Sequence, residues 1–257
     1  MRLVARTLIA ALLALSFAPA EAREFKKLRI GTDGTYPPFS QRGPDGRPTG
    51  FDVEVAAAVC ARLQAECEVV ALGWDDLLPA LLQRRVDLLV ASQPITDDAR
   101  RAIEFTARYH QIAPRFVARS ADLGRSTGRA ALADRTVGVR AGTAHAVWLA
   151  EARPEAKRME FRTEAEAGAA LLDGRVDVVF GDALALYGWL DRLEPRGRAG
   201  FTGEPVLAPR NFGDGAGIAF RRDDRDLGAL VDKALVDIGR DGTLDRIAAH
   251  WFPFAIR

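Results

Sequence analysis

Apolar and polar positions follow the same order in two stretches of this chain that lie ninety residues apart. Residues 80–92 read as a helix end, a turn, a short buried strand and a polar residue, and residues 170–182 repeat that order. Self-similarity at this spacing indicates two copies of one α/β unit. The two strands end in Ser92 and Asp182. Ligands of open α/β sheets bind beyond the carboxyl ends of strands, so we expect these residues on facing walls of one cleft.

Hydrophobic periodicity predicts the elements that surround each repeat. Strands alternate with helices, which favours parallel pairing through right-handed crossovers. The predicted strands are 28–32, 68–72 and 86–90 in the first unit and 136–140 and 176–181 in the second, and the predicted helices of the first unit are 51–63 and 75–83.

The C-terminal region is expected to complete the first of two lobes. Residues 227–251 read as two helices that break near 239–242, and we expect them to return to the first lobe. The sequence therefore predicts an α/β protein with two lobes, each a mostly parallel sheet flanked by helices, joined by a two-stranded hinge. The predicted division is a signal peptide at 1–22, lobe 1 at 23–110 and 212–257, lobe 2 at 115–205, and hinge segments at 111–114 and 206–211.

The first 22 residues have the pattern of an export signal. Arg2 and Arg6 precede an apolar run from Leu8 to Ala18, and small residues up to Ala22 supply a cleavage site. The run is too short to span a bilayer. We therefore expect a secreted, soluble, periplasmic protein.

Composition narrows the range of partners. The chain has 36 basic and 35 acidic residues, a formal net charge of +1, which argues against a nucleic-acid or anionic-membrane surface. Apolar residues make up 48% of the chain, enough to build a core in each lobe.

Cys60 and Cys67 are the two cysteines of the sequence. An even count in an exported chain favours a disulfide between them. Two free buried thiols are the alternative, and two cysteines alone cannot complete a zinc site. The three histidines have no metal-ligand spacing, so we expect neither a metal nor another cofactor.

Six short motifs carry a resemblance to a known family: Leu28-Arg-Ile-Gly-Thr-Asp33, Tyr36-Pro-Pro-Phe-Ser40, Gly50-Phe-Asp52, Ile95-Thr-Asp97, Phe105-Thr106 and Asn211-Phe-Gly-Asp-Gly215. With them, nearly all of the chain after the signal resembles the periplasmic amino-acid-binding proteins of ABC importers (solute-binding protein family 3). It is most similar to the lysine/arginine/ornithine- and histidine-binding branch, whose disulfide has a spacing similar to Cys60–Cys67. The resemblance implies the type II periplasmic binding protein fold and an ABC permease of the inner membrane as partner.

The resemblance also implies roles for individual residues in ligand binding. Asp33 matches the carboxylate that meets a basic ligand side chain, and Tyr36 and Trp74 match the aromatic walls around it. A carboxylate between π-faces suits a guanidinium or ammonium group. Asp182 matches the acceptor of the ligand's α-ammonium group, and Ser92 is expected to hydrogen-bond the ligand.

Thr143 adds an expected contact from the second lobe. It opens a predicted helix, where backbone N–H groups attract a carboxylate.

Three positions depart from the family pattern. Ala99 stands where the family has the Arg that grips the α-carboxylate, Pro94 stands where it has Thr or Ser, and Arg140 stands where it usually has an apolar residue near the ligand side chain. A missing anchor and an added cation leave open a ligand that lacks a normal α-carboxylate, or one that binds in a changed orientation.

The sequence thus predicts a monomeric, non-catalytic solute-binding protein that captures a small cationic or zwitterionic amino acid or related amine by hinge closure. Two alternatives stay open at this point. One is a periplasmic enzyme that resembles cyclohexadienyl dehydratase and uses Asp182 or Asp33 as a proton donor. The other is a ligand-binding sensor that signals to a membrane receptor.

Overall fold

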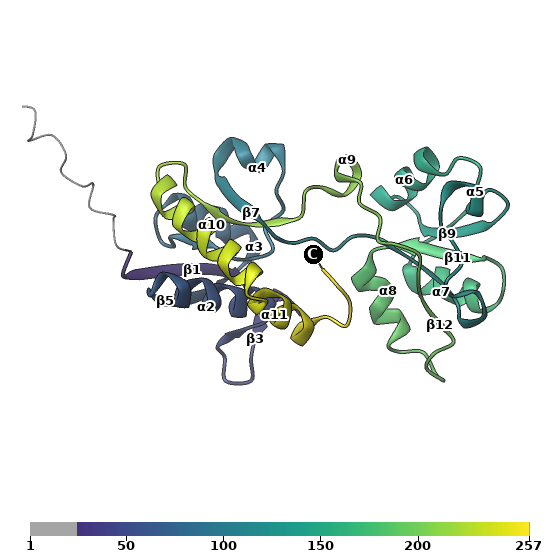
Figure 1. The fold of residues 1–257 in the computed structure, drawn as a ribbon, viewed down its shortest axis with the longest axis horizontal. Coiled ribbons are helices and arrows are strands. Elements are labelled where there is room, and N and C mark those ends of the chain that lie inside the picture. The colour runs from purple at the N-terminus through teal and green to yellow at the C-terminus, as the bar shows by residue number, and fades with distance from the viewer. Residues whose placement is uncertain (1–24, 257) are drawn as a thin grey trace, which may run out of the picture.

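Two separate sheets form two lobes that lie side by side and are joined by extended segments (Figure 1). The computed structural model describes residues 25–256. We call the sheet with the N-terminal strand and its helices lobe 1, and the other sheet with its helices lobe 2. The strand order in lobe 1 is β5 (Glu66–Leu72), β1 (Lys27–Asp33), β6 (Leu88–Leu89), β13 (Ala216–Phe220) and β7 (Glu104–His110).

Lobe 2 repeats this architecture with different residues. Its strand order is β10 (Lys157–Phe161), β9 (Thr136–Arg140), β11 (Val178–Gly181), β8 (Arg115–Arg119) and β12 (Ala199–Thr202). In each sheet one strand, β13 or β8, runs antiparallel to both of its neighbours, and the remaining pairs are parallel. The predicted fold class, two lobes with mostly parallel sheets, is therefore confirmed.

The helices cover the faces of the two sheets. Lobe 1 has α2 (Phe51–Leu63), α3 (Trp74–Leu82), α4 (Asp97–Ala102), α10 (Arg225–Arg240) and α11 (Thr243–Trp251). Lobe 2 has α5 (Arg129–Leu132), α6 (Ala144–Ala152), α7 (Glu164–Leu172), α8 (Ala183–Leu190) and the 3-10 turn η2 (Ser120–Asp122). The small sheet β2 (Thr35–Tyr36), β3 (Ser40–Arg42), β4 (Pro48–Thr49) follows β1, and α9 (Pro209–Phe212) lies in a connecting segment.

Local sequence explains why these elements form. In α2, Phe51, Val55 and Val59 recur every four residues and are buried against lobe 1, while Asp52 and Glu54 lie in the first turn. Residues 225–240 form α10 and residues 243–251 form α11, so the predicted break between two C-terminal helices is confirmed. The predicted strand 86–90 is shorter in the structure, Leu88–Leu89, and the backbone N–H groups of Asp87 and Val90 on either side also donate to carbonyls of β1.

An aspartate in each copy of the repeat performs the same task. The Asp87 carboxylate accepts a hydrogen bond from the Arg29 backbone N–H at 2.9 Å, where β1 begins. The Asp177 carboxylate accepts one from the Thr136 backbone N–H at 2.8 Å, where β9 begins. The repeated Val-Asp pair therefore ties the third strand of each unit to the start of the first.

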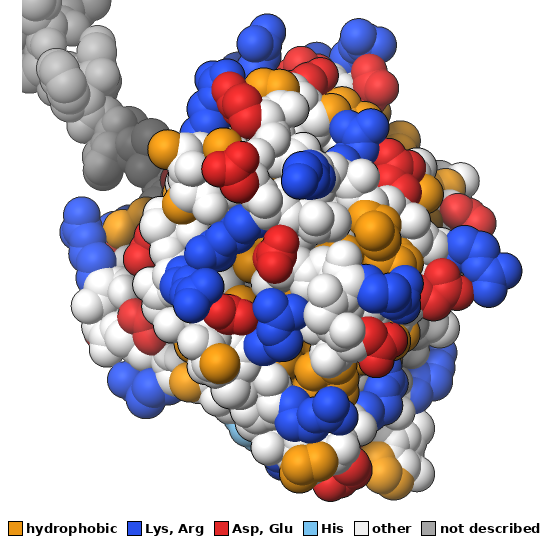
Figure 2. All heavy atoms as spheres, turned by 90° about the vertical axis from the view of Figure 1, so that its right-hand side faces the viewer, with side chains coloured by type: hydrophobic (Ala, Val, Ile, Leu, Met, Phe, Trp, Pro, Cys, Tyr) orange, Lys and Arg blue, Asp and Glu red, His pale blue; other side chains and the backbone are white. Residues whose placement is uncertain are grey.

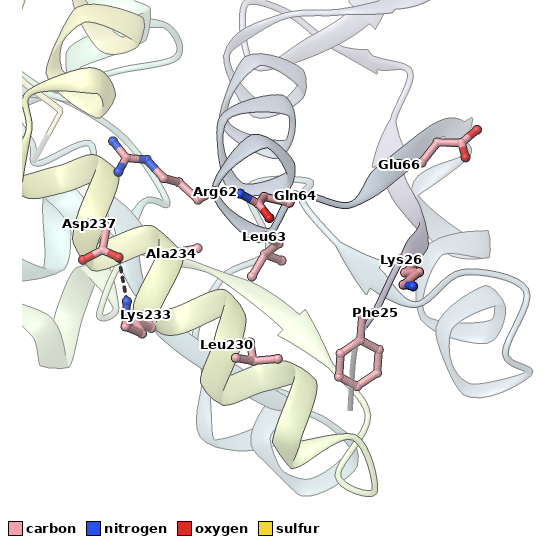
Figure 3. Close-up of a pocket in the computed structure, with 10 residues that line it drawn as sticks. All are labelled: Phe25, Lys26, Arg62, Leu63, Gln64, Glu66, Leu230, Lys233, Ala234 and Asp237. Atoms are coloured by element: carbon pink, nitrogen blue, oxygen red, sulfur yellow. Dashed lines mark hydrogen bonds and ion pairs between the residues drawn. The ribbon is translucent and has the colours of Figure 1, made fainter. Parts of the chain in front are cut away.

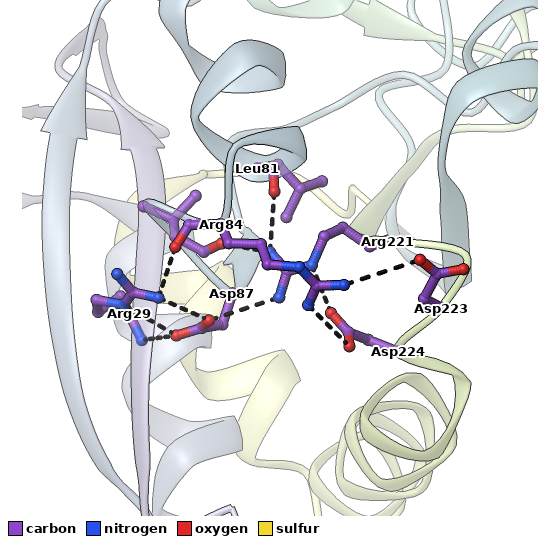
Figure 4. Close-up of polar contacts among 8 residues, drawn as sticks. Arg29, Leu81, Arg84, Asp87, Arg221, Asp223 and Asp224 are labelled. Carbon is purple, nitrogen blue, oxygen red and sulfur yellow. Dashed lines mark hydrogen bonds and ion pairs between the residues drawn. The ribbon is translucent and has the colours of Figure 1, made fainter.

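An arginine outside the repeat completes the correspondence. Arg221 follows the antiparallel strand of lobe 1, and Arg119 ends the antiparallel strand of lobe 2. Each guanidinium donates from one Nη1 to two carbonyls of the repeat, Leu81 and Val86 for Arg221, and Leu171 and Val176 for Arg119. Figure 4 shows the lobe 1 cluster with Arg29, Asp87 and Arg221 side by side.

Two chain segments and the C-terminal tail connect the lobes. One segment follows β7 and leads to β8, and the other leads from β12 through α9 to β13. Gln111 joins the first to the second by donating from Nε2 to the Gly213 carbonyl at 3.1 Å, and its backbone N–H donates to the Ile256 carbonyl at 2.6 Å. In the tail, Phe252 is buried in the lobe 1 core, whereas the Phe254 ring contacts two aromatic rings of lobe 2, Tyr187 and Phe201.

The expected disulfide between Cys60 and Cys67 is present and joins α2 to β5. Within the described part of the chain, no helix has both the length and the apolar run needed to cross a bilayer. The predicted signal peptide at 1–22 lies outside the described residues.

Candidate ligand-binding site

Asp33 lies where β1 ends, at the edge of the lobe 1 sheet. The residue is only 6% exposed, and Oδ1 accepts hydrogen bonds from the Thr35 backbone N–H at 3.0 Å and the Thr35 hydroxyl at 2.8 Å. The strand register places Asp33 opposite Leu72 of β5, two residues before Trp74. Asp33 and the first residue of α3 therefore follow neighbouring strands at the same edge.

Tyr36 and Trp74 are large aromatic side chains that remain about half exposed, at 46% and 45%. The Tyr36 ring stacks on Phe39, with centroids 4.9 Å apart and an interplanar angle of 18°, so one face is supported by the core. Exposed rings beside a carboxylate offer contact surfaces for a cationic guest. Burial raises the pKa of the Tyr36 hydroxyl, and the Asp182, Asp52 and Asp33 carboxylates raise it further.

The effect of Asp182 on Tyr36 links the two lobes, because Asp182 belongs to lobe 2. Asp182 follows β11 and caps α8, where its Oδ1 accepts a hydrogen bond from the Ala185 backbone N–H at 2.8 Å. Thr143 caps α6 in the same way, accepting from the Ala146 N–H at 3.3 Å. Thr143 and Asp182 therefore both stand at helix N-termini, next to strand ends.

Arg140 is the last residue of β9 and its side chain is half exposed. Its guanidinium lies 3.5 Å from the carboxylate of Glu164, the first residue of α7. Glu164 has no distinctive signal in the sequence, because an acid in the first turn of a helix is a common structural feature. The three predicted residues of lobe 2, Arg140, Thr143 and Asp182, are brought to one edge of the sheet by the parallel pairing of β9 with β11.

Ser92 points into the interior of lobe 1. Its hydroxyl donates to the Asp52 carboxylate at 2.9 Å and lies 2.9 Å from His110 Nε2, while its backbone N–H donates to the Tyr109 hydroxyl at 2.9 Å. Its φ of 49° is left-handed, a conformation that is uncommon for a residue with a side chain. The network holds Ser92 in this conformation at the sheet edge, and its contact with a ligand stays a prediction.

Asp52 forms the centre of this buried network. Its side chain is fully buried and accepts a hydrogen bond from the Tyr109 hydroxyl at 2.6 Å. Burial raises the pKa of the Asp52 carboxyl to about 7, although hydrogen bonds from Tyr109 and Ser92 oppose the shift, and the Asp33 charge adds to it. Burial lowers the pKa of His110 to about 3, so its imidazole is neutral. In the sequence Asp52 belongs to the Gly50-Phe-Asp52 motif, which does not indicate its distant partners Ser92, Tyr109 and His110.

The segment that carries the two departures from the family pattern adds no charge to this region. Ala99 lies in α4 and packs against the lobe 1 core. The neighbouring Arg100 guanidinium lies 5.7 Å from the centre of the Phe105 ring. Pro94 forms an isolated bridge with Ala216.

Four cavities within residues 25–256 are lined by residues other than the seven predicted ligand-binding residues. One of about 750 Å³ lies on lobe 1 between α2, α10 and the start of β1, where Lys233 pairs with Asp237 (Figure 3). Another of about 580 Å³ lies in lobe 2 beside Trp148. Among residues 25–256, no group of three or more His, Cys, Asp or Glu side chains is placed to hold a metal ion.

Surface charge is mixed on the end of lobe 2 that points away from lobe 1. Figure 2 shows Lys and Arg side chains interspersed with Asp and Glu side chains over this face. Exposed ion pairs also occur in lobe 2, such as Arg162 with Glu166 at 3.0 Å, and each contributes little stability. This face therefore has no extended basic surface of the kind that binds nucleic acid.

Comparison with known proteins agrees with the fold and the motifs. The family model for bacterial extracellular solute-binding proteins, family 3, matches residues 28–254. The chain is 34% identical over 248 residues to the ABC transporter arginine-binding protein 1 of Escherichia coli (strain K12), covering 96% of this chain and 99% of that protein. An ancestral cationic amino acid solute-binding protein has a similar structure, with a TM-score of 0.63 and 28% identity over 88% of this chain and 96% of that one. The unliganded, open L-cystine solute receptor of Neisseria gonorrhoeae has the same fold, with a TM-score of 0.77 and 21% identity over 91% and 95% of the two chains. This chain belongs to family 3 of the bacterial extracellular solute-binding proteins.

Proposed function

We propose that this protein captures a small cationic amino acid in the periplasm and delivers it to an ABC permease in the inner membrane. One observation carries the proposal. Asp33 ends β1 of lobe 1, with the half-exposed rings of Tyr36 and Trp74 on segments that follow β1 and the neighbouring β5, and Asp182 follows β11 of lobe 2. Two acids on two lobes, with aromatic surfaces on lobe 1, match a guest with two cationic groups.

The physical basis of recognition follows from these groups. A guanidinium or ammonium over an aromatic face gains about 0.5–2 kcal/mol for each ring, more when water is excluded. Charge-assisted hydrogen bonds to Asp33 and Asp182 are about twice as strong as neutral ones. Together such contacts support micromolar affinity, a binding free energy of about 8 kcal/mol. The N-terminus of α6, capped by Thr143, supplies N–H groups for an anionic end of the ligand.

Closure of the two lobes would complete the site. We infer that the segments 111–114 and 206–211 act as the hinge, since the chain passes between the sheets at these points. Ser92 and Asp33 would then hold the ligand from lobe 1, and Asp182, Thr143 and Arg140 would close over it from lobe 2.

The comparisons support transport rather than catalysis. The Escherichia coli relative is named as an arginine-binding protein, and the ancestral relative as a binder of cationic amino acids. On this proposal, incubation with prephenate or arogenate should give no product.

Isothermal titration calorimetry with the mature protein tests the proposal. We expect L-arginine or L-ornithine to bind at micromolar concentration or below, and L-citrulline, which has the shape of arginine without its side-chain charge, to bind at least about tenfold more weakly. Asp33→Asn should reduce that discrimination, whereas Asp97→Asn, an exposed acid at the start of α4, should not. Equal affinity for L-citrulline and L-arginine, or turnover of a substrate, would overturn the proposal.

A further inference from the structure

The proposed ligand carries an anion as well as two cations, and the acids described so far cannot hold it. A free amino acid brings an α-carboxylate into the site. On lobe 1 the predicted contacts are Asp33, two aromatic rings and Ser92, whose hydroxyl donates to Asp52. The nearby α4 contributes Ala99, which is packed in the core, and Arg100, which lies over Phe105. A positive partner for the carboxylate must therefore come from lobe 2.

Arg140 is positioned to supply it. Parallel pairing aligns Val139 of β9 with Phe180 of β11, so Arg140 ends one strand beside Gly181, which ends the next and is followed by Asp182. Within the described residues 140–143 and 181–183, which end these two strands, Arg140 is the one base. A cation and an anion thus stand at the ends of adjacent strands, an arrangement that suits an α-carboxylate and an α-ammonium group carried by one carbon.

Glu164 contacts the Arg140 guanidinium but leaves several of its N–H donors available. Glu164 makes a single contact with Arg140 Nη1, at 3.5 Å, and its own side chain is only 14% exposed. A guanidinium has five N–H donors in its plane, so an edge with two N–H groups remains for a bidentate carboxylate. Gly181 leaves room beside Glu164, because a Cβ at Gly181 would lie 3.7 Å from Glu164 Cγ.

The backbone of Arg140 is fixed to the start of α6. The Thr143 hydroxyl donates to the Arg140 carbonyl at 2.8 Å while it also caps the helix. The N-terminal N–H groups of α6 therefore lie a short turn away from Arg140, and both favour an anion.

His145 is the other basic side chain near these groups, and it does not compete. Burial lowers the pKa of His145, and although Asp182 and Glu164 raise it and Arg140 lowers it, the net shift is downward. Its ring stacks on Phe212 at 5.2 Å between centroids. The imidazole is neutral at neutral pH, whereas a guanidinium is always charged.

We propose that Arg140 binds the α-carboxylate of the captured amino acid and so makes the site selective for ligands with a free carboxylate. This inference rests on the proposed function and specifies the ligand class. Asp182 then takes the α-ammonium group, and Asp33 with its two aromatic neighbours takes the side-chain cation. Lobe 2 would recognise the amino-acid head group and lobe 1 the side chain.

A double-mutant cycle between protein and ligand tests the proposal. L-argininamide keeps the guanidinium and the α-ammonium group of arginine but replaces the carboxylate by a neutral amide. Calorimetry should show that the wild-type protein binds L-arginine about 10- to 100-fold more tightly than L-argininamide, as expected for a charge-assisted bidentate contact. The variant Arg140→Gln should bind the two ligands with similar affinity, and Arg140→Lys should retain part of the difference.

Arg162→Gln is the matched control, since Arg162 follows the edge strand β10 of the same sheet and pairs with Glu166. It should leave both affinities unchanged, and all variants should keep the thermal midpoint of the wild type. If Arg140→Gln weakens both ligands by the same factor, or neither, Arg140 does not bind the carboxylate and the proposal is overturned while the proposed function stands. If the wild-type protein binds neither ligand, the proposed function fails and this inference fails with it.

Discussion

Replacing Asp52 by Asn should change how the stability of the protein depends on pH. The Asp52 carboxyl is fully buried and its pKa is raised from 3.8 to about 7, chiefly by burial. Between these two values the native state holds a proton that the unfolded state has lost, so stability falls as pH rises from about 4 to about 7. Above pH 7 this decrease in the free energy of unfolding is complete. At about 1.36 kcal/mol for each pKa unit between the two states, the total decrease is about 4 kcal/mol.

The amide that Asp52→Asn introduces does not ionise, so the variant should escape this loss. It keeps the shape of the carboxyl and one acceptor for the Tyr109 hydroxyl. Urea unfolding of both proteins at about pH 5, 6, 7 and 8 measures the effect. The stability of Asp52→Asn relative to wild type should increase by about 3 kcal/mol between pH 5 and pH 8, because most of the titration lies in that interval. All other titrating groups cancel in the difference.

Tyr109→Phe provides the opposite perturbation. It removes a hydroxyl that donates to Asp52 and accepts from the Ser92 N–H, so it leaves the ionised carboxylate with one donor fewer. This variant should lose more stability at pH 8 than at pH 5. A relative stability of Asp52→Asn that stays constant across the four pH values would refute the reasoning, since it would mean that Asp52 has an ordinary pKa.

Two further predictions concern stability. Replacing Cys60 and Cys67 together by Ser should lower the free energy of unfolding by about 2–3 kcal/mol in urea titration, because the bridge closes a short loop; a reducing agent should then destabilise the wild type and leave the variant unchanged. Phe254→Ala should cost about 2 kcal/mol, since it removes two aromatic contacts that tie the C-terminal tail to lobe 2, whereas Leu207→Ala at a 67% exposed position should have no effect; equal losses for both would contradict the role of the tail.

Local pattern was sufficient to predict the two lobes. The repeat at 80–92 and 170–182 predicted two similar units, because buried strands and amphipathic helices show a characteristic periodicity of apolar residues. The arginines that cap these repeats, Arg119 and Arg221, were not predicted. They come from antiparallel strands distant in sequence, and a contact of that kind has no local pattern.

The same contrast applies to the candidate site, where the sequence predicted some residues but not their contacts. Asp33 and Asp182 could be placed at strand ends, since each follows an apolar run. Ser92 was expected at the sheet edge, but its hydroxyl partners, Asp52 and His110, lie 40 and 18 residues away, so its buried network was invisible. Glu164 was missed because its contact with Arg140 depends on the pairing of strands rather than on sequence neighbours.

A crystal structure of the protein with L-arginine tests the central claim most directly. The account predicts one ligand molecule between closed lobes, with the Asp33 and Asp182 carboxylates each within about 3 Å of a different cationic group of that molecule. A ligand that contacts one lobe alone, or that occupies the cavity between α2 and α10, would contradict it.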